Sequence, residues 1–73
     1  MIKLKRYRVF FMNGNDICID AESASYSYYE NAKKTFLVYT IGSKVIATFN
    51  ADNICGDIVI DEYSEKDITG RGI

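Results

Sequence analysis

One turn near the N-terminus constrains the fold of this chain more than any other feature. Asn13-Gly14-Asn15 separates two segments in which apolar and charged residues alternate. A three-residue loop at these positions keeps apolar and charged side chains on opposite faces, whereas a two-residue turn would set Phe11 against Asp16. The pattern therefore predicts a β-hairpin with the cross-strand pairs Val9–Ile19, Phe11–Ile17, Tyr7–Ala21, Arg8–Asp20 and Arg6–Glu22.

The rest of the chain also has the sequence pattern of β-strands joined by short turns. Runs of β-branched and aromatic residues alternate with short polar turns, and the chain has no proline. Gly42-Ser43 is typical of a two-residue hairpin turn, and Asn50–Asn53 of a tight or 3₁₀ turn. The expected strands are Lys3–Met12, Asp16–Tyr29 with a bulge near Glu22 or Ser23, Thr35–Ile41, Lys44–Phe49 and Ile54–Tyr63.

These elements predict an all-β protein: a five-stranded antiparallel meander that forms a curled sheet or a small barrel. The 73 residues allow only one domain, which we assign to residues 1–63. Residues 64–73 are mostly polar, and we expect a flexible tail there.

Composition excludes several classes of function. The chain has no histidine, so it cannot by itself form a Ser-His or Cys-His pair or a zinc site that contains histidine. Cys18 and Cys55 are expected to be free thiols in a cytoplasmic protein, because neither a signal peptide nor a membrane span is evident. We therefore expect no enzyme activity, cofactor or metal.

An apolar row is the most suggestive binding feature. With a five-residue loop after Tyr29, Tyr26 faces Val38 and Tyr28 faces Phe36 inside the sheet. The remaining apolar residues then point outward, as an interface for a protein partner or for a second copy in a homo-oligomer. This expected interface consists of Leu37, Tyr39, Ile41, Ile46 and Phe10.

Nucleic-acid binding is the alternative. Tyr29 would stack on unpaired bases while Lys33 and Lys34 hold phosphates. The net charge of −1 weighs against it. A small-ligand site at a subunit boundary is also compatible with the sequence.

The segment Lys44–Ile54, preceded by Tyr7–Phe11 and the Asn-Gly loop, resembles small β-rich proteins of bacteriophages and prophages of Gram-positive bacteria. The strand order, with a turn before the last strand, also resembles Sm-like and SH3-like small barrels, without the N-terminal helix and RNA-binding motif of the Sm-like proteins. The phage resemblance implies an inhibitor or modulator of a bacterial host protein, including proteins of host immunity, in the bacterial cytoplasm.

Overall fold

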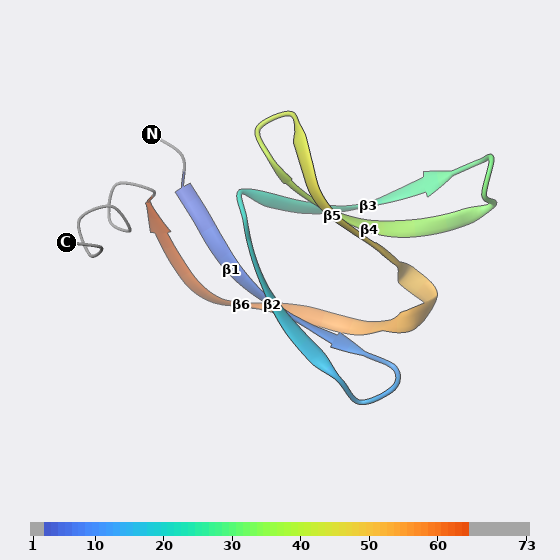
Figure 1. The fold of residues 1–73 in the computed structure, drawn as a ribbon, viewed down its shortest axis with the longest axis horizontal. Coiled ribbons are helices and arrows are strands. Elements are labelled where there is room, and N and C mark those ends of the chain that lie inside the picture. Colours follow the sequence, from blue (N-terminus) through green and yellow to red (C-terminus); the bar gives the residue numbers. More distant parts are fainter. Residues whose placement is uncertain (1–2, 65–73) are drawn as a thin grey trace.

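The computed structural model describes residues 3–64 and is all-β, as predicted. The strands form two three-stranded antiparallel sheets, with strand orders β2-β1-β6 and β3-β4-β5, and Figure 1 shows how they are arranged. The elements are β1 (Lys3–Phe11), β2 (Asp16–Ala21), β3 (Ser23–Tyr29), β4 (Lys34–Ile41), β5 (Lys44–Asn50), the 3₁₀ turn η1 (Ala51–Asn53) and β6 (Ile54–Ser64).

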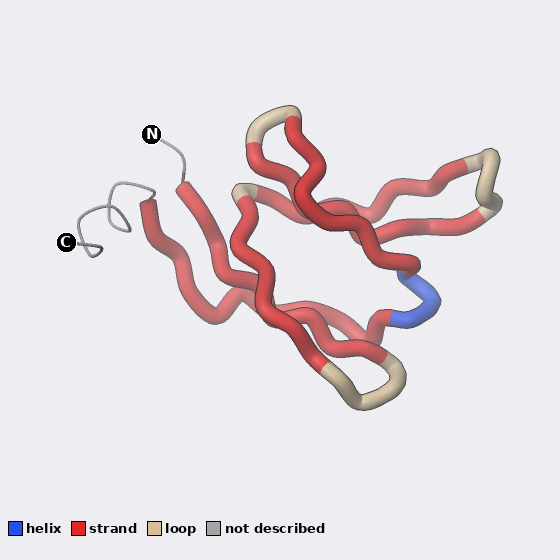
Figure 2. The backbone as a smooth tube through the Cα atoms, in the orientation of Figure 1, coloured by secondary structure: helices blue, strands red, loops and turns tan. Residues whose placement is uncertain are grey.

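A bend at Glu22 carries the chain from one sheet to the other. Only this residue separates β2 from β3, so the two strands form one long bent strand, as Figure 2 shows. The Glu22 backbone N–H donates to the Thr40 carbonyl oxygen at 2.9 Å, and the neighbouring Ala21 is fully buried. The bulge expected near Glu22 or Ser23 therefore corresponds to the corner between the sheets.

The β1–β2 hairpin has a three-residue loop, but the loop begins one residue earlier than expected. The Phe11 N–H donates to the Asn15 carbonyl oxygen at 2.8 Å, so the loop is Met12–Gly14. Gly14 takes the last loop position, where its φ of +91° favours glycine. The expected pairs are therefore wrong by two residues, yet each side chain keeps its face because a shift of two preserves the alternation. The observed pairs include Val9–Ile17, Tyr7–Ile19 and Arg6–Asp20.

The register of β4 differs from the prediction by one residue, and this reverses the strand's faces. The β3–β4 loop has four residues, 30–33, so Tyr26 pairs with Leu37 and not with Val38. The predicted Gly42-Ser43 turn is present, but Ile46 lies between two registers of β5 as a bulge. Both differences move the odd-numbered residues of β4 to the inner face.

The core lies between the two sheets. Its buried members are Tyr7, Val9, Ala21, Leu37 and Tyr39. The rings of Tyr7 and Tyr39 lie 5.0 Å apart, and the Tyr39 hydroxyl donates to Asp57 Oδ2 on β6 at 2.8 Å. This hydrogen bond joins the inner faces of the two sheets.

The last strand returns to the first. β6 pairs with β1 along its length, with irregularities between Arg6 and Tyr7 and between Phe10 and Phe11. Before it, the predicted 3₁₀ turn is confirmed: the Asn50 side chain accepts the Asp52 N–H at 3.0 Å. β6 extends through Ser64, and the rest of the expected tail lies outside the described residues. Within residues 3–64, no helix has the length and apolar character needed to cross a bilayer.

Candidate functional site

The expected apolar interface does not form a surface. Leu37 and Tyr39 are 1% and 0% exposed, so their placement on the outer face is wrong. Ile41 and Phe10 are half-buried, and the Arg8 guanidinium lies 5.2 Å from the Phe10 ring. Of the five residues, only Ile46, 37% exposed at its bulge, is exposed. A partner-binding surface must therefore lie elsewhere.

The alternative nucleic-acid residues do lie together, at the tip of the β3–β4 hairpin. Tyr29 packs against Phe36 with ring centroids 5.1 Å apart, and Lys33 occupies the turn. Lys34 lies 3.9 Å from Asp52, so its charge is partly compensated. Tyr26 and Tyr28, expected in the core, are exposed because the hairpin extends beyond the other sheet (Figure 1).

A polar network on the outer face of β1, β2 and β6 is structural. Arg6 donates two hydrogen bonds to Asp20, at 2.9 and 3.2 Å, and the Tyr63 hydroxyl donates to the same carboxylate. The Arg6 hydrogen bond lowers the pKa of Asp20, and the Asp20 hydrogen bond raises the pKa of Tyr63. The Arg6–Glu22 and Arg8–Asp20 pairs are thus replaced by Arg6–Asp20 and Arg8–Asp16.

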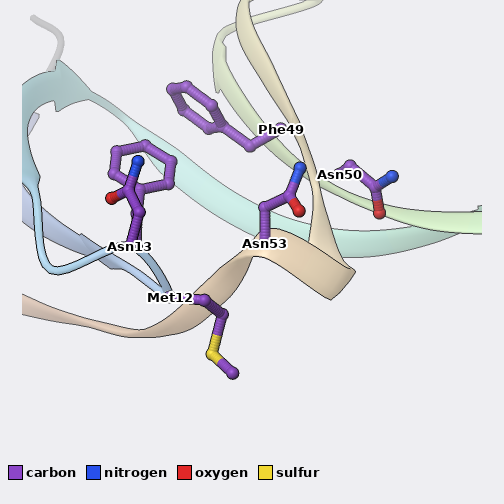
Figure 3. Close-up of a pocket in the computed structure, with 6 residues that line it drawn as sticks. Met12, Asn13, Phe49, Asn50 and Asn53 are labelled. Atoms are coloured by element: carbon purple, nitrogen blue, oxygen red, sulfur yellow. The ribbon is translucent and has the colours of Figure 1, made fainter.

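A pocket of about 500 Å³ opens where the β1–β2 turn meets the end of β5 and η1. The Met12 N–H donates to the Asn53 carbonyl oxygen at 2.8 Å and holds the two turns together. Figure 3 shows the Asn13 and Asn53 amides on the side of the Phe49 ring, while the Asn50 amide and Met12 point away from it. The lining residues are Phe11, Met12, Asn13, Phe49, Asn50 and Asn53, none of which is charged.

A second candidate surface is the outer edge of β6. β6 ends its sheet, so no other described strand pairs along this edge. Ile58, Val59 and Ile60 are 51%, 51% and 48% exposed. Val59 shares the inward face of its partner Tyr7, but no strand of the opposite sheet covers it. An exposed apolar run on an open strand edge is a ready site for an added strand.

Comparison with protein-family models, with curated proteins and with solved structures returns no match for this chain. In residues 3–64, no group of three or more acidic or cysteine side chains is arranged to hold a metal ion. Cys18 and Cys55 are free and exposed.

Sequence reasoning missed both surfaces. Asn13, Asn50 and Asn53 are each explained by the preference of asparagine for turns, so none indicates a pocket in the sequence. The two turns come together only because β1 pairs with β6, a long-range contact. The run Ile58–Ile60 did carry a signal. Three consecutive β-branched residues cannot all face one core, because successive side chains of a strand point to opposite faces.

Proposed function

We propose that this chain is a non-enzymatic protein-binding module whose contact surface is the free edge of β6. The supporting observation is the half-exposed run Ile58–Ile60 on a strand that no other described strand pairs with on its outer side. Pairing with an extended segment would satisfy the backbone groups of this edge and cover part of each of the three side chains. The phage- or prophage-encoded inhibitor of a bacterial protein is a biological role consistent with such a module.

The charges around the run indicate the chemistry of the partner. Asp57 precedes it, and Asp61 and Glu62 follow it. On the edge that β1 occupies, the two acids that follow the run lie opposite basic residues: Arg6 pairs with Asp61, Lys5 pairs with Glu62, and Lys3 lies 3.9 Å from Glu62. Asp57 instead pairs with Val9 and accepts a hydrogen bond from the Tyr39 hydroxyl. A partner strand with apolar residues followed by lysine or arginine would be matched in the same way.

A pair of short peptides tests this proposal. Both contain the same Val-Ile-Val centre, and their flanking residues are lysine in one and glutamate in the other. We expect the lysine peptide to shift the backbone amide resonances of residues 57–62 in an NMR titration, and the glutamate peptide to bind at least about tenfold more weakly.

Two variants localise the binding. Val59→Lys on β6 should abolish the response, whereas Val45→Lys, at an exposed position of β5, should leave it unchanged. Equal binding of the two peptides, or shifts confined to the β3–β4 hairpin, would contradict the proposal. Salt-sensitive binding of single-stranded RNA, lost in Lys33→Glu with Lys34→Glu, would favour the nucleic-acid alternative instead.

A further inference from the structure

The pocket between the two turns has an unusual balance of hydrogen-bonding groups. Asn13 Oδ1 accepts the Asn15 N–H at 3.0 Å, and Asn50 Oδ1 accepts the Asp52 N–H at 3.0 Å. These bonds engage the oxygen of each amide, so that each retains its NH₂ group as a free donor. The Asn53 carboxamide has no hydrogen bond to another described residue, which leaves a donor and an acceptor. The three side chains thus offer more free N–H donors than free lone pairs, because each engaged oxygen keeps one lone pair and the Asn53 oxygen keeps two.

The aromatic wall adds a shape requirement. The rings of Phe11 and Phe49 meet edge to face with centroids 5.5 Å apart. Such rings bind flat, polarisable groups by stacking or edge contacts. The volume of about 500 Å³ is within the usual range for small-molecule sites. A flat ring is therefore a better match for this wall than a branched aliphatic group.

The absence of charge among the lining residues selects a neutral ligand. Amide donors alone compensate a buried anion poorly, but they match neutral carbonyl oxygens well. A ring that carries carbonyl oxygens beside an N–H would use the free NH₂ group of Asn13 together with both ends of the Asn53 amide, which lie on the side of the Phe49 ring.

We propose that this pocket binds an uncharged nucleobase with ring carbonyl oxygens, of the uracil or hypoxanthine type. Its ring would lie against Phe11 and Phe49, and its carbonyl oxygens would accept hydrogen bonds from the asparagine NH₂ groups. This site is separate from the β6 edge and does not depend on the proposed protein-binding function.

The test compares inosine with adenosine, which have the same size and differ at the six position: inosine has a carbonyl oxygen beside an N–H where adenosine has an amino group. The side-chain NH₂ resonances of Asn13, Asn50 and Asn53 are observed directly by NMR. We expect uridine and inosine to shift these resonances, and adenosine to bind at least about tenfold more weakly because the NH₂ donors would face another donor.

Variants separate the site from the fold. Asn53→Asp keeps the side-chain shape but exchanges the NH₂ donor for a charged acceptor, and it should weaken uridine binding by about tenfold or more. Asn31→Asp, in the exposed β3–β4 loop, introduces the same charge and should leave binding unchanged. Circular dichroism melting confirms that both variants are folded.

Three results would overturn the proposal: no response to uridine or inosine at about 10 mM, equal binding of adenosine and inosine, or equal binding of N-methylacetamide, a carbonyl compound without a ring. The last result would assign the pocket to a peptide group. Because the readout is the asparagine side chains, failure here leaves the test of the β6 edge unaffected.

Discussion

At the scale of single residues, the Tyr39 hydroxyl forms a hydrogen bond between the two sheets from a fully buried side chain. Its side chain is 0% exposed, and it donates to the half-buried Asp57 carboxylate. Tyr39→Phe keeps the ring packing but removes the donor, and it should lower the free energy of unfolding by about 1.5–3 kcal/mol, the usual worth of a hydrogen bond to a charged group. Urea unfolding followed by circular dichroism measures this change.

Tyr63→Phe is the matched control. It also removes a hydroxyl that donates to a carboxylate, but Asp20 keeps its two hydrogen bonds from Arg6. We expect a loss of about 1 kcal/mol or less. If Tyr63→Phe lowers the free energy of unfolding as much as Tyr39→Phe does, the Tyr39–Asp57 hydrogen bond between the sheets contributes no more than an ordinary tyrosine–carboxylate bond.

The two tyrosine and aspartate environments also predict a pH dependence. Burial, followed by the hydrogen bond to Asp57, raises the pKa of Tyr39, so its contribution to stability is complete below about pH 10 and is lost as the pH rises further. The Arg6 hydrogen bond lowers the pKa of Asp20, so its contribution is complete above about pH 4 and is lost as the pH falls through the lowered folded-state pKa.

Thermal melts across pH check both directions. Tyr39→Phe should flatten the alkaline limb of the stability profile and leave the acid limb unchanged, whereas Asp20→Asn should flatten the acid limb. If each variant shifts the whole profile without changing its shape, the two groups do not titrate differently in the folded and unfolded states.

At the scale of the elements, turn geometry decides which side chains are buried. Gly14 and Gly42 have φ values of +91° and +59°, in the left-handed region, whereas the φ of Gly56 lies outside that region. No heavy atom lies within 4 Å of the Cβ that alanine would add at any of the three. Gly14→Ala and Gly42→Ala should therefore each cost about 1–2 kcal/mol from backbone strain alone, with Gly56→Ala neutral or slightly stabilising.

Guanidinium unfolding of the three alanine variants gives the comparison. Because the space at each glycine is open, a clash cannot explain a difference among them. An equal effect of all three substitutions would mean that left-handed backbone is not what these turns require.

The sequence predicted the strands, the Gly42-Ser43 turn and the 3₁₀ turn, because each has a local signal. It did not predict which residues of β4 face the opposite sheet: Leu37 and Tyr39 belong to the core cluster, whereas Val38, also buried at 5% exposure, does not. The run Thr35–Ile41 has apolar residues on both faces, so alternation carries no information there and the register depends on the turns. The β3–β4 loop is one residue shorter than expected, and β5 has a bulge at Ile46. Together these two differences place Leu37, and not Val38, on the inner face. The pocket could not be predicted either, because it forms only when β1 pairs with β6, near the two ends of the chain.

This reversal has a direct energetic consequence. Leu37→Ala removes a side chain that is 1% exposed, and it should cost about 2–5 kcal/mol or abolish cooperative unfolding. Ile46→Ala, in the same predicted row but accessible, should cost less than about 1.5 kcal/mol. Similar losses in urea unfolding would indicate the register first expected from the sequence.

At the scale of the whole molecule, the two sheets leave an open side. β5 and β6 are both terminal strands of their sheets, and β6 exposes the apolar side chains of Ile58, Val59 and Ile60. The radius of gyration is 13.6 Å, larger than the about 11 Å typical of a compact chain of this length. The chain is therefore extended, and its core is small relative to its exposed surface. A partner would bury the most additional area on the open side.

Whether a second copy fills this side depends on charge. In a two-fold antiparallel pairing centred on Val59, Asp57 of one copy lies opposite Asp61 of the other, and the symmetry repeats this contact. We therefore expect a monomer of 8.3 kDa in light scattering at moderate salt. Asp61→Lys places opposite charges at both contacts and should produce a dimer that high salt dissociates. A wild-type dimer that persists in Asp61→Lys and in Val59→Lys would place self-association on another surface and leave the β6 edge for a foreign strand alone.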